Sequence, residues 1–139
     1  TCEQLIKNNW DGIVIEPVKY YYDKLPKYPH INYENIAISD TEGETNIHYL
    51  DPEIINNKSQ LWMKGISSIE GETGPLSFNE NSFMKENTII QKVNTDTLQN
   101  ICDKYNVSKI DFLKIDTEGH DFIVLQSLDL DKVYVKKKF

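Results

Sequence analysis

Residues 110–121 read Ile-Asp-Phe-Leu-Lys-Ile-Asp-Thr-Glu-Gly-His-Asp, and this stretch is the most informative part of the chain. Its first half, from Ile110 to Ile115, is a nearly continuous apolar run, which is typical of a parallel strand covered on both faces. Gly119 then permits a tight turn within a polar cluster, and the apolar residues over 122–128 predict a helix. In an open α/β sheet, ligands bind outside the carboxyl ends of the strands. The polar cluster therefore lies where such a fold places its chemistry.

Short apolar strands and helices alternate along the rest of the chain. The further helices are expected at residues 1–9, 18–25 and 96–105, and the further strands at 13–15, 35–39, 46–50, 89–93 and 132–136. Asp96 is expected to be the N-cap of the third helix. Residues 51–87 follow no period, and irregular loops of this length are usually functional or disordered. The pattern predicts one α/β domain over residues 1–139, with a Rossmann-like, doubly wound parallel sheet.

Composition excludes several classes of protein. The net charge of −7 argues against non-specific binding to nucleic acid or to an anionic membrane surface. There is no apolar run long enough to span a membrane, and no signal peptide is apparent. Cys2 and Cys102 fit neither a disulfide framework nor a metal site, so we expect a reducing, cytoplasmic setting and assign no metal ligands.

Glu16 lies at the carboxyl end of the expected strand 13–15. A carboxylate at this place, roughly 20 residues after a glycine-rich loop, is how Rossmann-like folds bind a ribose diol. Counting back by that spacing reaches a point just before Thr1, so the glycine loop is expected upstream of the chain. The alternative is a surface carboxylate that ends a strand before Pro17.

Asp116, Glu118 and His120 form the polar cluster after the strand at 110–115. Asp116 and His120 are candidates for general acid–base catalysis, and a carboxylate metal site is a weaker reading of the same residues. Glu118 and Asp121 would otherwise complement the positive end of the following helix. Lys114 interrupts the apolar strand, and Asp116 is its natural partner on the same face, unless Lys114 extends to water from an edge strand.

Ser68 belongs to a short polar segment within the long irregular stretch, where its hydroxyl can hydrogen-bond a ligand. No G-x-S-x-G motif surrounds it, which disfavours a hydrolase nucleophile. The chain also lacks a P-loop, an H-E-x-x-H motif and a C-x-x-C motif, so NTPase and zinc-enzyme readings lose support.

At these residues the chain resembles the FkbM family of S-adenosylmethionine-dependent methyltransferases. The likeness covers nearly the whole chain and is carried by residues 10–17, 35–43, 95–98 and 110–128. The resemblance implies a class I methyltransferase fold, S-adenosylmethionine as cofactor, and O-methylation of a hydroxyl on a small molecule, a sugar or a glycolipid.

The resemblance also implies roles for individual residues. Glu16 would bind the cofactor ribose, and Asp40 would lie near the adenine. Asp116, with Glu118 and His120, would face the methyl-transfer centre, where Asp116 or His120 would act as the base that takes the acceptor proton. Ser68 and Lys114 complete the set of residues assigned to cofactor binding.

The family's glycine-rich first motif, its first strand and its last strands have no counterpart in the chain. The expected fold is therefore a class I methyltransferase fold truncated at both ends. Two other functions stay open on the sequence alone. An NAD-dependent oxidoreductase would use the same ribose carboxylate, and a non-catalytic Rossmann-like binding module would keep the core strands without the ligand loop.

Overall fold

The elements of this chain follow from short apolar runs separated by proline, glycine and polar turns. The structure, a computed structural model, describes residues 2–54, 66–69 and 86–136. The helices are α1 (Cys2–Lys7), α2 (Lys19–Lys24), α4 (Leu98–Lys104) and α5 (Asp121–Gln126). The strands are β1 (Gly12–Ile15), β2 (Ile31–Glu34), β3 (Ala37–Ile38), β4 (Gly43–Leu50), β5 (Ser67–Ile69), β6 (Thr88–Asp96), β7 (Lys109–Ile110) and β8 (Tyr134–Val135).

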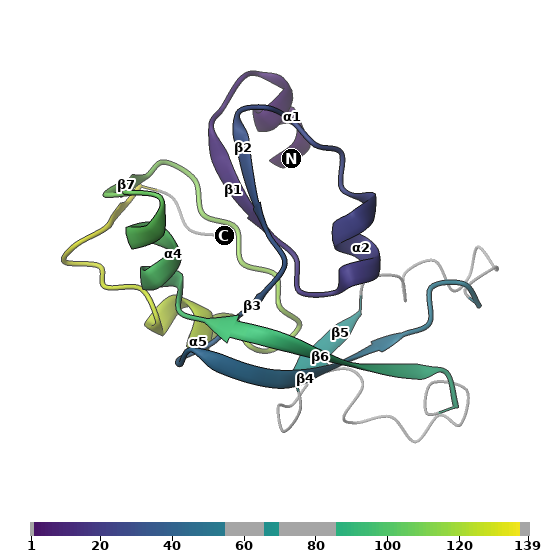
Figure 1. Cartoon of the computed structure of the whole chain (residues 1–139). Helices are drawn as coiled ribbons and strands as arrows, with labels where there is room; N and C mark the ends of the chain where they lie inside the picture. Colours follow the sequence, from purple (N-terminus) through teal and green to yellow (C-terminus); the bar gives the residue numbers. More distant parts are fainter. Residues whose placement is uncertain (1, 55–65, 70–85, 137–139) are drawn as a thin grey trace.

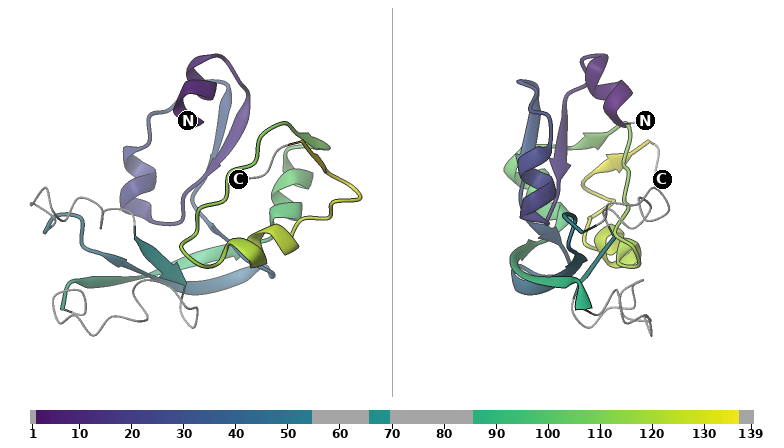
Figure 2. Two further views of the ribbon diagram at one scale, coloured as in Figure 1. Left: turned by 180° about the vertical axis from the view of Figure 1, so that it is seen from behind. Right: turned by 90° about the vertical axis from the view of Figure 1, so that its right-hand side faces the viewer.

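The described strands form three sheets. β1 and β2 are a parallel pair, and β7 and β8 are a second parallel pair. The largest sheet has the order β3-β6-β4-β5, in which β3 is parallel to β6 while β4 is antiparallel to both β6 and β5. In Figure 1 the β1–β2 pair stands above this larger, curved sheet, and Figure 2 shows the same arrangement from behind.

Two apolar clusters hold these parts together. The first joins β3, α4, α5 and the segment before β8, and its buried members are Ile38, Leu98, Ile101, Cys102, Val124, Leu128 and Val133. The second fixes the start of α2 against the curved sheet, and its buried members are Val18, Ala37, Ile47, Tyr49 and Val93. Val18, only 1% exposed, follows directly after Glu16 and Pro17, so it anchors the carboxyl end of β1 on this sheet.

The architecture confirms an α/β protein and corrects the expected single parallel sheet. Only four residues, 39–42, connect β3 to β4, and a connection that short reverses the chain because a parallel connection requires roughly a dozen residues. The β4–β6 ladder is therefore antiparallel, over eight residue pairs. Among the described residues, β1 pairs with β2 alone and β7 with β8 alone, so the doubly wound arrangement is not formed as one sheet.

Three local predictions differ from the structure. The strand expected at 110–115 is regular only as far as Ile110, because its partner β8 offers two residues for pairing. The strand expected at 35–39 is shortened to β3, which pairs with β6, and a separate strand that was not predicted, β2, precedes Asn35 and pairs with β1. The N-cap of α4 is Thr97 and not Asp96, since the Thr97 side chain accepts from the Asn100 N–H. Asp96 instead accepts from the Thr97 N–H and from Asn100 Nδ2.

The other expected elements are confirmed within one to three residues at each end. These are the helices near 1–9, 18–25, 96–105 and 122–128 and the strands near 13–15, 46–50, 89–93 and 132–136. Most of the irregular stretch 51–87 lies outside the described residues. None of the described helices has the length and apolar character that crossing a membrane requires.

Candidate functional site

Glu16 is held in place at the carboxyl end of β1. Its Oε1 accepts a hydrogen bond of 2.8 Å from the Val18 N–H, and its own backbone N–H donates to the Glu34 carbonyl across the strand pair. The Asn35 side chain donates to the carbonyls of Glu16 and Pro17, which fixes the chain as it leaves the strand. The carboxylate is therefore presented at a defined position.

Burial raises the pKa of the Glu16 carboxyl above its ordinary value, and the hydrogen bond from Val18 offsets only part of this effect. A carboxylate has about four lone-pair sites, so one backbone donor leaves acceptor capacity for a ligand. A vicinal diol, which brings two hydroxyl donors, suits that remaining capacity. The chemistry of Glu16 thus fits the ribose of a nucleoside cofactor.

Asp116 and Lys114 form an exposed ion pair. The distance from Lys114 Nζ to Asp116 Oδ2 is 2.8 Å, and both side chains are more than half exposed. The hydrogen bond that Lys114 donates to Asp116 is the main reason that the pKa of Lys114 is raised. The pairing expected from the sequence is confirmed, and it occupies Oδ2 of Asp116.

The turn before α5 has an unusual backbone. Glu118 has φ of 55° and Gly119 has φ of 125°, so two successive residues occupy conformations with positive φ. Glycine adopts such angles readily, whereas a glutamate there carries strain of about 1–2 kcal/mol. Strained backbone of this kind clusters at functional sites. The polar cluster predicted from the sequence therefore contains a conformation that favours a functional reading.

Asp121 organises the same turn. Its Oδ1 accepts from the Thr117 N–H at 2.9 Å and from Thr117 Oγ1 at 3.1 Å, and these bonds lower the pKa of the Asp121 carboxyl, the backbone bond most strongly. Asp121 is the first residue of α5, where a negative charge also complements the helix dipole. Asp121 therefore has a structural role in this turn, and its place in the first turn of α5 agrees with the alternative reading of its charge.

His120 differs from the two carboxylates of its cluster because it is buried. The side chain is 4% exposed, whereas Asp116 and Glu118 are exposed. Its Nε2 lies 3.3 Å from Ser39 Oγ, which follows β3, and Ser39 Oγ lies 3.3 Å from Asp40 Oδ1. The structure thus joins Asp40 to His120 through Ser39, two predicted site residues that are 80 positions apart.

Ser68 lies on the face of the sheet opposite to the one that packs against Val18. It pairs with His48 across β4 and β5, and residues paired across strands share a face. The neighbouring pair, Ile47 and Ile69, points to the opposite face and packs with Val18. Ser68 is therefore buried on the side opposite to the residue that anchors Glu16, and the structure does not bring it together with Glu16.

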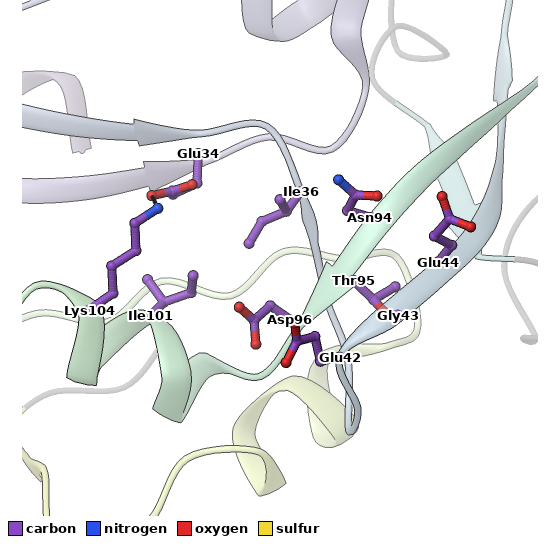
Figure 3. A pocket seen from close by; sticks show the side chains of 10 residues that line it. All are labelled: Glu34, Ile36, Glu42, Gly43, Glu44, Asn94, Thr95, Asp96, Ile101 and Lys104. Atoms are coloured by element: carbon purple, nitrogen blue, oxygen red, sulfur yellow. Dashed lines mark hydrogen bonds and ion pairs between the residues drawn. The ribbon is translucent and has the colours of Figure 1, made fainter.

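An acidic hollow of about 420 Å³ lies next to the turn after Asp40, and none of the site residues predicted from the sequence lines it. Its lining residues are Glu34, Ile36, Glu42, Gly43, Glu44, Asn94, Thr95, Asp96, Ile101 and Lys104 (Figure 3). Lys104 pairs with Glu34, and Asp96, Glu42 and Glu44 supply the other charged groups of the lining. Four carboxylates and one amine make this hollow unsuited to an anionic ligand.

The tyrosines of α2 are engaged in packing. Tyr21 makes edge contacts with Tyr20 and Tyr49, and the Lys24 ammonium lies 3.6 Å from the centre of the Tyr20 ring. Lys27 similarly lies over Tyr22. Each of the three ring systems therefore has a partner within the chain, in agreement with a packing role.

Sequence reasoning missed two residues of this site, Ser39 and Thr117. In the sequence Ser39 is simply the last residue of an expected strand, and its contact with His120 spans 81 residues, so no local pattern indicates that contact. Thr117 had a usable signal, because a hydroxyl residue four positions before an aspartate at a helix start is well placed to donate to it.

Replacement of Glu16 by glutamine is expected to stabilise the fold at neutral pH. A glutamine retains an acceptor for the Val18 N–H but removes a charge that burial disfavours. Because the native pKa is raised, the native stability of the unmodified chain falls as pH rises from the ordinary glutamate value of 4.5 through the native pKa. Denaturant titrations should therefore show Glu16→Gln more stable at pH 7, with the difference disappearing below about pH 4.

Glu34→Gln provides a control with the opposite sign. Burial alone would raise the pKa of Glu34, but hydrogen bonds from Lys104 and Tyr105 outweigh it and the pKa is lowered. Its carboxylate therefore stabilises the fold at neutral pH, and that contribution is lost as pH falls through the native pKa. If the free energy of unfolding of Glu16→Gln and Glu34→Gln changed with pH in the same way, the burial assigned to the Glu16 carboxyl would be contradicted.

The strain at Glu118 is testable by comparing glycine with alanine at this position. Both substitutions remove the carboxylate, but only glycine relieves the positive φ. Glu118→Gly should exceed Glu118→Ala in free energy of unfolding by about 1 kcal/mol in a denaturant titration. Asn106, at φ of 54°, offers the same comparison outside the site. A glycine variant less stable than the alanine variant at position 118 would show that the turn is not left-handed.

Comparison with known proteins gives one match. The family model described as the methyltransferase FkbM domain matches residues 1–138, which is nearly the full length of the chain. Neither the comparison with curated proteins nor the comparison with solved structures gave a match.

Proposed function

The chain belongs to the methyltransferase FkbM family, and from this we propose that it transfers a methyl group from S-adenosylmethionine to a hydroxyl oxygen. The acceptor class we propose is a small molecule, a sugar or a glycolipid, and we propose a cytoplasmic setting. The observation that carries the proposal is the half-buried Glu16 carboxylate, fixed by Val18 at the carboxyl end of β1.

The cofactor would be held by residues after β1 and β3. Glu16 would accept from the ribose hydroxyls, and Asp40, exposed after β3, would lie near the adenine. When bound, S-adenosylmethionine supplies a methyl group on a sulfonium, which is electrophilic toward an oxygen nucleophile. The Lys114 ammonium lies 2.8 Å from the Asp116 carboxylate. Lys114 would therefore act on cofactor binding indirectly, by holding Asp116.

Methyl transfer to an alcohol requires removal of the hydroxyl proton. We assign this role to Asp116, because its carboxylate is exposed and can contact an acceptor directly, whereas the ring of His120 is buried. Lys114 holds Oδ2 of Asp116, and Oδ1 would take the proton from the acceptor oxygen. Glu118, one residue beyond Thr117 in the same turn, would add negative charge that favours a neutral or cationic acceptor.

The family does not by itself identify the ligand, so binding is the first test. In a calorimetric titration of the full-length protein, S-adenosylhomocysteine should bind with a micromolar Kd, and Glu16→Ala should weaken binding by about 10-fold to 100-fold, the loss of a charged hydrogen-bond acceptor. Glu44→Ala is the matched control, because it removes an exposed carboxylate paired with Lys92.

NAD is the control ligand for the same titration. Binding of NAD in place of S-adenosylhomocysteine would replace the methyltransferase proposal with an oxidoreductase. Binding of neither ligand by the folded protein would leave a non-catalytic module.

The assignment of Asp116 is tested by turnover. Asp116→Asn keeps the shape of the side chain but cannot take a proton, so methyl transfer to a panel of sugar and small-molecule hydroxyls should fall by about 10²–10⁴-fold. The affinity for S-adenosylhomocysteine should change little. Asp111→Asn is the matched control, since Asp111 forms an equivalent exposed ion pair with Lys109. Normal turnover of Asp116→Asn would exclude Asp116 as the base.

A further inference from the structure

Ser39 is the residue through which the two halves of the candidate site touch. Its backbone N–H donates to the Asp96 carbonyl at 2.9 Å, so Ser39 is fixed to the end of the β3–β6 ladder. Its hydroxyl oxygen lies 3.3 Å from His120 Nε2 on one side and 3.3 Å from Asp40 Oδ1 on the other. A single small side chain therefore contacts one residue at the carboxyl end of β3 and one at the start of α5.

The direction of the hydrogen bonds follows from the proton count. A serine hydroxyl has one proton to donate, and the Asp40 carboxylate can only accept it. If Ser39 donates to Asp40, its oxygen must accept from His120, so both contacts are satisfied only when His120 carries a proton on Nε2. The three residues then form a chain in which each hydrogen bond polarises the next.

The position of His120 is coupled to the turn that precedes it. Asp121 and Thr117 close this turn, so Glu118 and Gly119 lie within a segment fixed at both ends. The carbonyl of His120 also accepts from the Val124 N–H, which joins the residue to α5. His120 is therefore joined through its backbone to the turn that carries Glu118 and follows Asp116.

We propose that Ser39 is a positioning residue that holds the imidazole of His120 in its Nε2–H form and the carboxylate of Asp40 in one arrangement. Ser39 thereby fixes the position of the Asp40 carboxylate relative to the turn that follows Asp116. The inference rests on the proposed function for its consequence in catalysis, but the arrangement itself concerns the three side chains alone.

The tautomer of His120 provides a readout that does not require activity. Nitrogen-15 NMR of the full-length protein distinguishes the ring nitrogens of its three histidines, His30, His48 and His120. The His120 signals should report the Nε2–H form in the unmodified chain and in Ser39→Thr, which retains the hydroxyl. Ser39→Ala should change the tautomer mixture of His120 while leaving those of His30 and His48 unaltered. An Nδ1–H form in the unmodified chain, or no change in Ser39→Ala, would overturn the proposal.

A double-mutant cycle tests the consequence for the site. Ser39→Ala should weaken binding of S-adenosylhomocysteine and lower kcat by about threefold to tenfold each, because the hydroxyl that contacts both Asp40 and His120 is lost. His120→Gln places a side-chain N–H near the former Nε2 and should retain most activity, whereas His120→Phe should not. In the His120→Phe background, the further effect of Ser39→Ala on kcat should be smaller than in the unmodified chain, because the contact is already absent.

Full additivity of Ser39→Ala and His120→Phe would contradict the proposal, because independent residues add. The conservative variants Ser39→Thr and His120→Gln keep the test available if an alanine or phenylalanine variant does not fold. Failure of the proposed function gives a different result. S-adenosylhomocysteine would then not bind to any variant, while the NMR signals of His120 would still report on Ser39.

Discussion

Burial of the apolar cluster beneath α4 and α5 is the interaction on which the rest of the structure depends. Ile38, Val124 and Val133 come from three distant parts of the chain and are all buried in this cluster. Ile38 immediately precedes Ser39, and Val124 follows His120 by one helical turn, so their packing brings those two polar residues into contact. At about 25 cal/mol per Å² of apolar surface, such burial outweighs the hydrogen bond that it makes possible.

Glu16 and Glu34 are neighbouring carboxylates whose different surroundings give them different roles. Glu16 and Glu34 meet at the ends of β1 and β2, where the Glu16 N–H donates to the Glu34 carbonyl. Glu34 is neutralised by Lys104 and Tyr105, which join β2 to α4, so its charge contributes to the architecture. Glu16 receives one backbone hydrogen bond and has a raised pKa. Of the two, only Glu16 keeps a carboxylate suited to a ligand, at some cost in stability.

Some of this organisation was predictable because its causes are local. The apolar run before Glu16 and the proline after it predicted both β1 and its end, and the apolar face of Leu98, Ile101 and Cys102 predicted α4. The length of the strand after Lys109 was not predictable, because it depends on how many residues β8 provides for pairing. The N-cap of α4 was predicted one residue too early, because Asp96 and Thr97 are both good capping residues and the sequence does not distinguish them.

Contacts between distant residues were beyond the reach of pattern analysis. The face on which Ser68 lies depends on the register of β5 against β4, and a shift of one residue would have reversed it. The pairing of Lys114 with Asp116 was predictable because residues two apart in an extended chain share a side. The burial of His120 was not, although Asp116, Glu118 and His120 are equally spaced in the sequence, because exposure is decided by what packs against each residue.

Energetically unfavourable and favourable features occur at different residues of the candidate site. The unfavourable features, a half-buried carboxylate at Glu16 and a positive φ at Glu118, both occur at residues proposed to meet ligand. The favourable features are side-chain hydrogen bonds to backbone N–H groups, made by Thr97 and by Asp121 to Thr117, and these residues hold the backbone in place. A chain selected for stability alone would not keep the first group, since glutamine and glycine would relieve each cost. These two costs, at the end of β1 and in the turn before α5, agree with the ligand-binding roles proposed for Glu16 and Glu118.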